Sequence, residues 1–181
     1  YEAKYPYRYG MKKAQIHTAF FPKLKPNVFD SFISRLEEEQ AIKRVDEFLS
    51  TPDYEVCKDA TYQQVSETLL GAMEKAGFDF VRYGEIPVKG VSQEVEDDIL
   101  NILLEEKQIV KVTEEMYTLS SYMEQAKEKI REKLKEEPVI TIAQVRDMFH
   151  TSRKSAKPIL EYMDTVKVTR KTGAESERVA Y

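Results

Sequence analysis

The chain has 181 residues, of which 41% are hydrophobic and 33% charged, with six glycines, seven prolines and a formal net charge of −4. This size and composition allow one ordinary core or two to three small ones, and they favour a helix-rich protein over a low-complexity chain. No stretch reaches the apolar length of a membrane span, and the single cysteine, Cys57, excludes an intramolecular disulfide and suits a reducing cytoplasm.

The charge is unevenly distributed along the chain. Residues 1–52 have a net charge of +2, residues 53–120 of −9 and residues 121–181 of +3. An acidic surface repels phosphate, whereas lysine and arginine side chains neutralise it. If the chain binds a nucleic acid, we therefore expect the contact at one end of the sequence and not in its middle.

The first 52 residues predict two helices followed by a β-ribbon. The segment 11–21 favours a helix that Pro22 ends, and Pro26 stands where a first-turn proline opens a second helix. Residues 41–51 contain two short β-prone runs around a tight turn. Four tyrosines lie within residues 1–10, and we interpret them as the frayed end and packing residues of an opening helix, although tyrosines can also stack on bases.

The middle of the chain predicts two further helices and a second ribbon. A long helix is expected to begin near Asp59 and to end at Gly77, and residues 78–90 are irregular. Ser92 can cap another helix, and residues 109–119 again contain two short β-prone runs around a turn.

The last third gives the most specific pattern. A helix is expected over residues 123–134, and two shorter helices over 140–149 and 153–163 have apolar residues at i, i+3 and i+4 steps. The three-residue turn at 150–152 offers a threonine and a serine as caps, and residues 166–181 alternate around a glycine-containing turn. Two helices joined by a short turn and followed by a ribbon describe a winged helix-turn-helix.

An internal repeat extends this architecture to the whole chain. Residues 36–45 align without gaps on residues 103–112, and residues 160–169 form a weaker third copy. Each copy is the end of a second helix that runs into the first ribbon strand. We therefore predict a mainly α fold with small β-ribbons, in which tandem winged helix-turn-helix domains form an elongated monomer. The predicted domains are residues 1–52, whose opening helix is incomplete, residues 53–120, which are acidic, and residues 121–181.

The basic residues of the last domain are the candidate nucleic-acid contacts. They lie on the second helix of the motif, on the ribbon and at the end of the preceding helix: Arg146, Arg153, Lys154, Lys157, Arg170, Lys171 and Arg178. At the start of the second helix, backbone amides and basic side chains would converge on one spot. The same position in the middle domain is acidic, and in the first domain it is ambiguous. We expect one domain to bind and the other two to act as spacers, so that residues 121–181 alone would bind as tightly as the whole chain.

The last domain also resembles a known family. The matching segments are Ile140–Asp147, Thr151–Lys154, Pro158–Asp164 and Val168–Lys171. They resemble the last winged-helix domain of the selenocysteine-specific elongation factors. Upstream, Tyr5–Lys13 and Leu24–Asp30 resemble more thinly the second winged-helix domain of the same C-terminal arm. The resemblance implies that the chain is roughly the last three of four such domains.

The function that this resemblance implies is binding of a messenger-RNA hairpin, the selenocysteine insertion element. The binding would bring a GTP-loaded factor with selenocysteinyl-tRNA to a recoded UGA codon on the ribosome, in the cytoplasm. In the family, the GTPase and tRNA-binding parts lie upstream. The present sequence has no glycine-rich Gly-x-x-x-x-Gly-Lys loop for a nucleotide.

No catalytic or metal-binding pattern accompanies the basic set. His17 and His150 stand alone, and Cys57 has no histidine at a useful position. The carboxylates Glu94, Glu96, Asp97 and Asp98 suit the dipole of a helix start better than a cation site. We expect no enzyme activity and no cofactor in this region. Two alternatives remain open: a winged-helix DNA-binding regulator and a protein-interaction scaffold.

Overall fold

The computed structural model describes all 181 residues and contains seven α-helices, two short 3-10 helices and nine short strands. They form two compact units, one of residues Tyr1–Gln64 with Val91–Ile102 and the other of residues Val65–Gly90 with Leu103–Tyr181. The strands make three antiparallel sheets with the orders β1-β3-β2, β4-β6-β5 and β7-β9-β8. The same order therefore occurs three times, and the internal repeat predicted two of the three strands in each sheet. None of the helices has the length and apolar character needed to cross a membrane.

The first unit contains one complete helix pair with its sheet. Its elements are β1 (Met11–Lys12), α1 (Lys13–Phe20), α2 (Pro26–Glu38), β2 (Lys43–Val45) and β3 (Phe48–Ser50). The boundaries lie close to the predicted ones, because α1 ends just before Pro22 and α2 begins with Pro26 as its first residue. Residues 1–5 make a single helical turn, in which the amide of Tyr5 donates to the carbonyl oxygen of Tyr1 at 3.0 Å, and turns and bends follow up to β1 in place of a regular helix. Tyr7 is a packing residue as expected, with its hydroxyl 3.0 Å from the Asp59 carboxylate.

A small apolar core holds this unit together. Phe29 and Ile33 of α2 pack against Leu49 of β3. Gly10 precedes β1 with a φ of 135°, and a Cβ atom there would lie 2.1 Å from the carbonyl oxygen of Leu49. Only glycine fits this close approach of two backbones.

Two of the acidic residues considered as a cation site are ion-paired in the same unit. Arg8 donates from Nε to Asp98 at 2.8 Å and from a terminal nitrogen to Glu94 at 2.8 Å. These contacts raise the pKa of Arg8 against the opposing effect of burial. The helix dipole is therefore only part of the reason for the acidic helix start.

The second unit contains the other two sheets. Their strands are β4 (Val81–Arg82), β5 (Ile109–Lys111), β6 (Met116–Leu119), β7 (Ile140–Thr141), β8 (Thr169–Lys171) and β9 (Glu177–Ala180). The first strand of each sheet was not predicted, because a two-residue strand is too short to show an alternating pattern. The middle helices α3 (Ala60–Ala76) and α4 (Gln93–Glu105) extend across both units. Between β4 and α4 the chain forms only the 3-10 turn η2 (Tyr83–Glu85), in place of the first helix of the motif.

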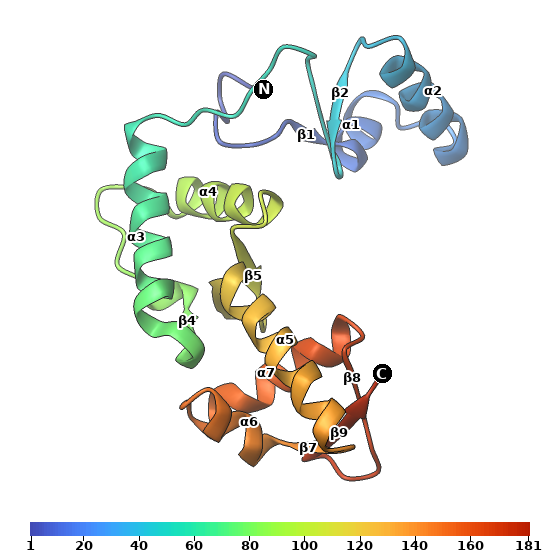
Figure 1. The fold of residues 1–181 in the computed structure, drawn as a ribbon. Helices are drawn as coiled ribbons and strands as arrows, with labels where there is room; N and C mark the ends of the chain where they lie inside the picture. Colours follow the sequence, from blue (N-terminus) through green and yellow to red (C-terminus); the bar gives the residue numbers. More distant parts are fainter. The chain divides into compact units, whose positions relative to one another are not determined.

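The last repeat is the complete winged helix-turn-helix. Its helices are α5 (Ser120–Glu136), α6 (Ile142–Met148) and α7 (Arg153–Thr165). α6 packs on α7, and α5 contacts α7 and β7 (Figure 1). Thr141 caps α6 in a reciprocal arrangement, in which its hydroxyl accepts from the amide of Gln144 and the Gln144 side chain accepts from the amide of Thr141.

The core of this last repeat includes residues from the middle of the chain. Phe80 is 8% exposed and belongs to the same apolar cluster as Ile130, Val145 and Ile159. Phe78, in the 3-10 turn η1 (Gly77–Asp79), lies with its ring centroid 4.4 Å from that of Phe149. This part of the middle repeat therefore packs into the domain that was predicted to bind, whereas its role as a spacer in RNA binding stays a prediction.

Candidate nucleic-acid interface

The start of α7 presents two free basic side chains. Ser152 is the N-cap residue, and Arg153 and Lys154 follow it as the first two helical residues. Both are exposed and neither has an ion-pair partner. Arg153 also lines a hollow of about 250 Å³ together with Arg146, Ile142 and other residues of α6 and of the wing, which is the ribbon of β8 and β9 with the loop between them. Two arginines thus line the same hollow between α6, α7 and the wing.

Arg146 and Lys157 are exposed but already paired. The Arg146 guanidinium lies 2.7 Å from Asp147, and Lys157 Nζ lies 2.9 Å from Glu175 in the wing loop. The hydrogen bond from Lys157 lowers the pKa of Glu175, and the same bond raises the pKa of Lys157. Since these pairs are exposed, a phosphate can compete for the basic member at small cost.

The wing strand β8 supplies two more exposed cations. Arg170 donates to the carbonyl oxygen of Ala180 at 3.3 Å, and Lys171 has no hydrogen-bonded partner. Both border a shallow hollow of about 350 Å³ beside Tyr181. The predicted set therefore divides into a group at the start of α7 and a group on the wing.

Arg178 does not belong to either group. Its side chain is 1% exposed and donates from Nε to Asp164 at 2.7 Å. Its Nη1 also donates to the carbonyl oxygens of Glu175 and Glu177, at 2.7 and 3.1 Å. The expected nucleic-acid contact at Arg178 is therefore wrong in this conformation, because no atom of the guanidinium is available to a ligand. Arg178 instead holds the wing loop against the end of α7.

The cap of α7 comes from a residue that the sequence did not indicate. The hydroxyl of Thr151 donates to the Asp79 carboxylate and lies 3.0 Å from the carbonyl oxygen of Phe78. The amide of Ser152 also donates to the Asp79 carboxylate, at 3.2 Å. Neither of the two expected caps, Thr151 or Ser152, accepts a bond from the helix with its side chain. No signal in the sequence links these residues, which lie more than 70 positions apart.

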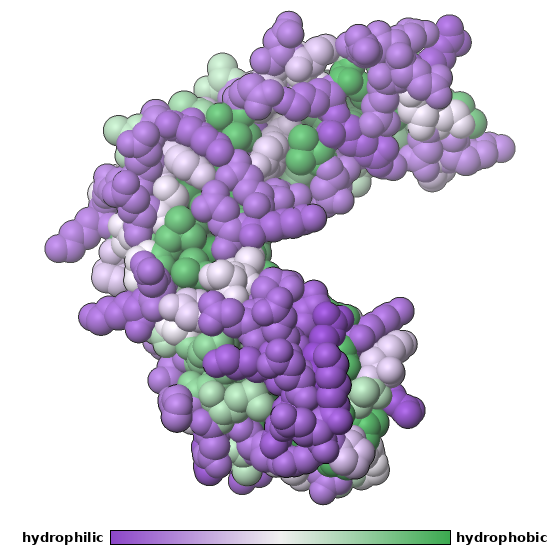
Figure 2. All heavy atoms as spheres, viewed as in Figure 1, coloured by the Kyte–Doolittle hydropathy of each residue, from purple (hydrophilic) through white to green (hydrophobic).

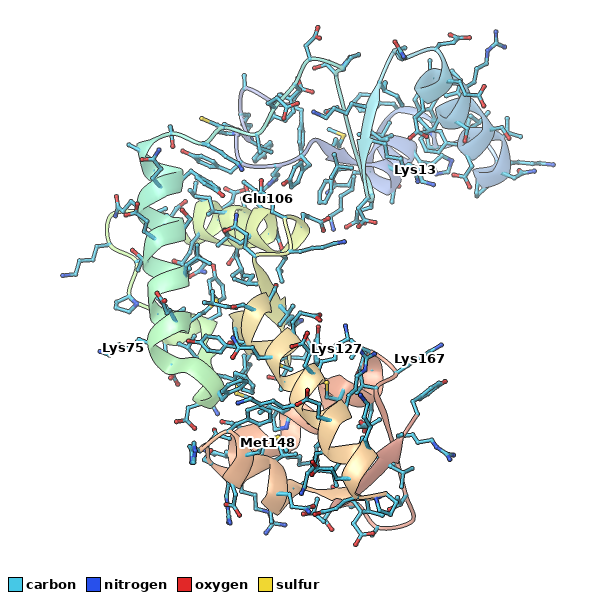
Figure 3. The ribbon with its side chains drawn as sticks, viewed as in Figure 1. Lys13, Lys75, Glu106, Lys127, Met148 and Lys167 are labelled. Atoms are coloured by element: carbon cyan, nitrogen blue, oxygen red, sulfur yellow. The ribbon has the colours of Figure 1, made fainter.

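The mixed-charge face of α5 is exposed and carries both ion-paired and unpaired cations, and its role as a solvated surface without RNA contacts stays a prediction. Lys127, labelled in Figure 3, pairs with Glu124 at 3.0 Å, and Lys133 pairs with Glu137 at 2.7 Å. Figure 2 shows a hydrophilic surface where α5 faces the viewer. Lys129, Arg131 and Lys135 of α5 are exposed and have no ion-pair partner, so the start of α7 is distinguished by its place at a helix N-terminus beside a hollow and not by the number of its unpaired cations.

Three repeated sheets and a helix-turn-helix with exposed cations at the start of its second helix define a tandem winged-helix protein. Two family models, both described as "Elongation factor SelB, winged helix", match the chain, the one for the second winged-helix domain over residues 1–50 and the one for the third over residues 132–176. The two matches cover more than half of the sequence. The chain therefore belongs to the selenocysteine-specific elongation factor family, as part of its winged-helix region.

Individual relatives agree with this assignment. The selenocysteine-specific elongation factor of Desulfomicrobium baculatum is 25% identical over 180 residues, which are 96% of this chain and 27% of that protein. The chain thus spans about a quarter of the length of this relative.

Two solved structures share the fold. The mRNA-binding domain of elongation factor SelB from E. coli, solved in complex with SECIS RNA, has a TM-score of 0.54 and 19% identity, and the match covers 67% of this chain and 98% of that one. A bacterial selenocysteine-specific elongation factor, EF-Sec, has the same TM-score and identity over 96% of this chain and 26% of its own.

Proposed function

We propose that this chain is the messenger-RNA-binding part of a selenocysteine-specific elongation factor, and that its last winged helix binds an RNA hairpin. The observation that carries the proposal is the pair of exposed, unpaired cations at the start of α7, Arg153 and Lys154, beside a hollow that Arg146 also lines. The E. coli relative, whose structure includes SECIS RNA, has the same fold.

A hairpin suits this surface better than a regular duplex. The loop of a hairpin offers splayed bases that side chains can stack on and hydrogen-bond, together with a compact phosphate backbone. In our proposal Arg153 and Lys154 contact the loop, and the wing residues Arg170 and Lys171 contact the phosphates of the stem. Lys157 and Arg146 join them when phosphate replaces their carboxylate partners.

The wider role follows from the family. In the complete protein, hairpin binding would bring a GTP-loaded factor with selenocysteinyl-tRNA to a recoded UGA codon on the ribosome, in the cytoplasm. We propose that hairpin binding by the present region itself requires neither nucleotide nor metal ion. Addition of GTP or of a chelator should leave the RNA affinity unchanged.

The test is a comparison of ligands and variants. The chain is titrated with a pool of RNA hairpins that share a stem and differ in the loop, and the best binder is compared with duplex DNA of the same sequence. Arg153→Ala should cost about 1–3 kcal/mol if the side chain contacts a base edge, whereas a phosphate contact should reduce the salt slope by about 1 on all RNAs. Lys133→Ala removes one paired lysine of α5 and serves as the control.

Each outcome has a distinct meaning. Tighter binding to the DNA duplex would favour a winged-helix regulator that places α7 in the major groove. Absence of binding to either nucleic acid would favour a protein-interaction scaffold. Equal losses from Lys133→Ala and Arg153→Ala would place the interface on α5 and refute the assignment to α7.

A further inference from the structure

The first turn of α7 is held by a residue of the middle repeat. Asp79 lies at the end of η1 and accepts hydrogen bonds from the Thr151 hydroxyl and from the Ser152 amide. The carbonyl oxygen of Asp79 accepts a further bond from the Ser155 hydroxyl at 3.1 Å. One short turn thus contacts the residues immediately before and after Arg153 and Lys154, although it belongs to a different repeat.

The turn that provides Asp79 is itself anchored in the core beneath α7. The Phe78 ring lies 4.4 Å from that of Phe149 and 5.2 Å from that of Tyr122, measured between centroids. Phe80 has a φ of 56° and a ψ of 162°, a backbone conformation that usually requires glycine. In the first repeat, the residue in the same place before the sheet is Gly10. A buried aromatic ring therefore holds this turn in a conformation that the backbone alone disfavours.

We infer that Asp79 is a positioning residue for the interface. Its carboxylate fixes the start of α7, which is the recognition helix of the helix-turn-helix motif, and thereby the direction of Arg153 and Lys154. The inference rests on the proposed RNA binding for its consequence. The carboxylate accepts a hydrogen bond from one of the amides at the helix start that have no partner within the helix. Its negative charge also interacts favourably with the positive end of the helix dipole. With the first turn fixed, the two long side chains lose less conformational freedom when they bind.

A role for Asp79 that depends on its charge alone predicts a change in RNA affinity of the opposite direction. If its negative charge did no more than repel phosphate, its removal would strengthen RNA binding. If it positions α7, its removal weakens binding although the net charge becomes more favourable. The direction of the change therefore distinguishes the two roles.

The experiment uses the full chain and the hairpin with the highest affinity. Asp79→Ala should weaken binding by about three- to tenfold, the range that a lost helix cap allows. Asp79→Asn keeps an oxygen that can accept from Thr151 and Ser152, and it should restore most of the affinity. Glu67→Ala removes an exposed acid from α3 with the same change in net charge, and it should leave binding unchanged or slightly tighter.

A second variant separates geometry from charge and does not depend on Asp79 itself. Thr151→Val removes the hydroxyl that donates to Asp79 and leaves every charge in place. It should weaken hairpin binding in the same direction as Asp79→Ala. Unchanged or tighter binding in both Asp79→Ala and Thr151→Val would overturn the inference while leaving the proposed RNA binding intact.

Amide hydrogen exchange gives a result that needs no RNA. In Asp79→Ala the amide of Ser152 loses its acceptor, and its exchange should become faster than in the unaltered chain and in Glu67→Ala. Unchanged exchange would refute the positioning role. If the unaltered chain bound no hairpin, the proposed function would fail, and this measurement would still decide whether Asp79 holds the start of α7.

Discussion

Replacement of either partner of the buried pair Arg178–Asp164 tests whether Arg178 is a structural residue or an RNA contact. The Arg178 side chain is 1% exposed, whereas that of Asp164 is 20% exposed. Asp164 also accepts a bond from the Thr169 hydroxyl at 2.7 Å. The carboxylate therefore keeps water and one donor when the arginine is removed, but the guanidinium keeps only two backbone carbonyl oxygens when the carboxylate is removed.

This difference in exposure and in remaining hydrogen-bond partners determines how much each replacement should lower the free energy of unfolding. Asp164→Ala leaves a buried charge without a counter-ion and should lower the free energy of unfolding by about 3–5 kcal/mol. Arg178→Met removes the buried charge, fills its space with an apolar chain and leaves a partly solvated carboxylate. We expect a smaller loss of about 1–3 kcal/mol, the cost of the lost hydrogen bonds.

The assay is urea unfolding followed by circular dichroism, because the chain has no tryptophan to report by fluorescence. The salt dependence of hairpin binding is measured on the same variants without urea, at a temperature at which both variants are folded. An Arg178→Met variant with full stability and a reduced salt slope would show that Arg178 contacts phosphate after all. A larger stability loss for Arg178→Met than for Asp164→Ala would refute the argument from exposure.

Two further changes test neighbouring parts of the structure. Glu175→Gln removes the nearer of the two carboxylates beside Lys157, at 2.9 Å against 3.8 Å for Glu161, and should make Lys157 more available to phosphate, with tighter hairpin binding and a salt slope steeper by up to about 1, measured by titration at several salt concentrations. Because Lys157 lowers the pKa of Glu175, the ion pair persists at neutral pH and is lost as the pH falls through that pKa, so the unaltered chain and the variant should converge in acid. Phe80→Ala should lower the stability of the last repeat by about 3–5 kcal/mol, seen as faster amide exchange in α7, and exchange changes limited to β4 would contradict the shared core.

Local patterns were sufficient to predict most helices and the repeat. The apolar spacing of residues 153–163 predicted α7 to within two residues at its end, and Pro26 marked the start of α2. These features are local, because a helix face and a first-turn proline depend on residues within a few positions. The stretch 78–90 was predicted as irregular, which holds except for the strand β4, since η1, β4 and η2 are too short to show a period.

The position of Arg178 could not be predicted by the same reasoning. On strand β9 successive side chains point to opposite faces, and a pattern based on hydrophobicity places Val179 inward and Arg178 outward. The structure has the arginine inside, because Asp164 at the end of α7 provides a counter-ion there. Such an inversion depends on a partner 14 positions away in a different element, and no periodicity reports it.

The contacts of Asp79 could not be predicted either, because their partners lie still further away in the sequence. They also give the middle repeat a structural role beside the last one. Its net charge of −9 excluded it as a site for phosphate, and from this we expected a spacer and full binding by residues 121–181 alone. Charge, however, determines only what a surface attracts, whereas the direction of a recognition helix depends on what holds its first turn. In this chain the last repeat supplies the cations, and the middle repeat supplies the cap and two aromatic rings beneath them. An acidic segment can therefore contribute to a nucleic-acid interface through geometry, and residues 121–181 without it would lack both the cap and part of their core.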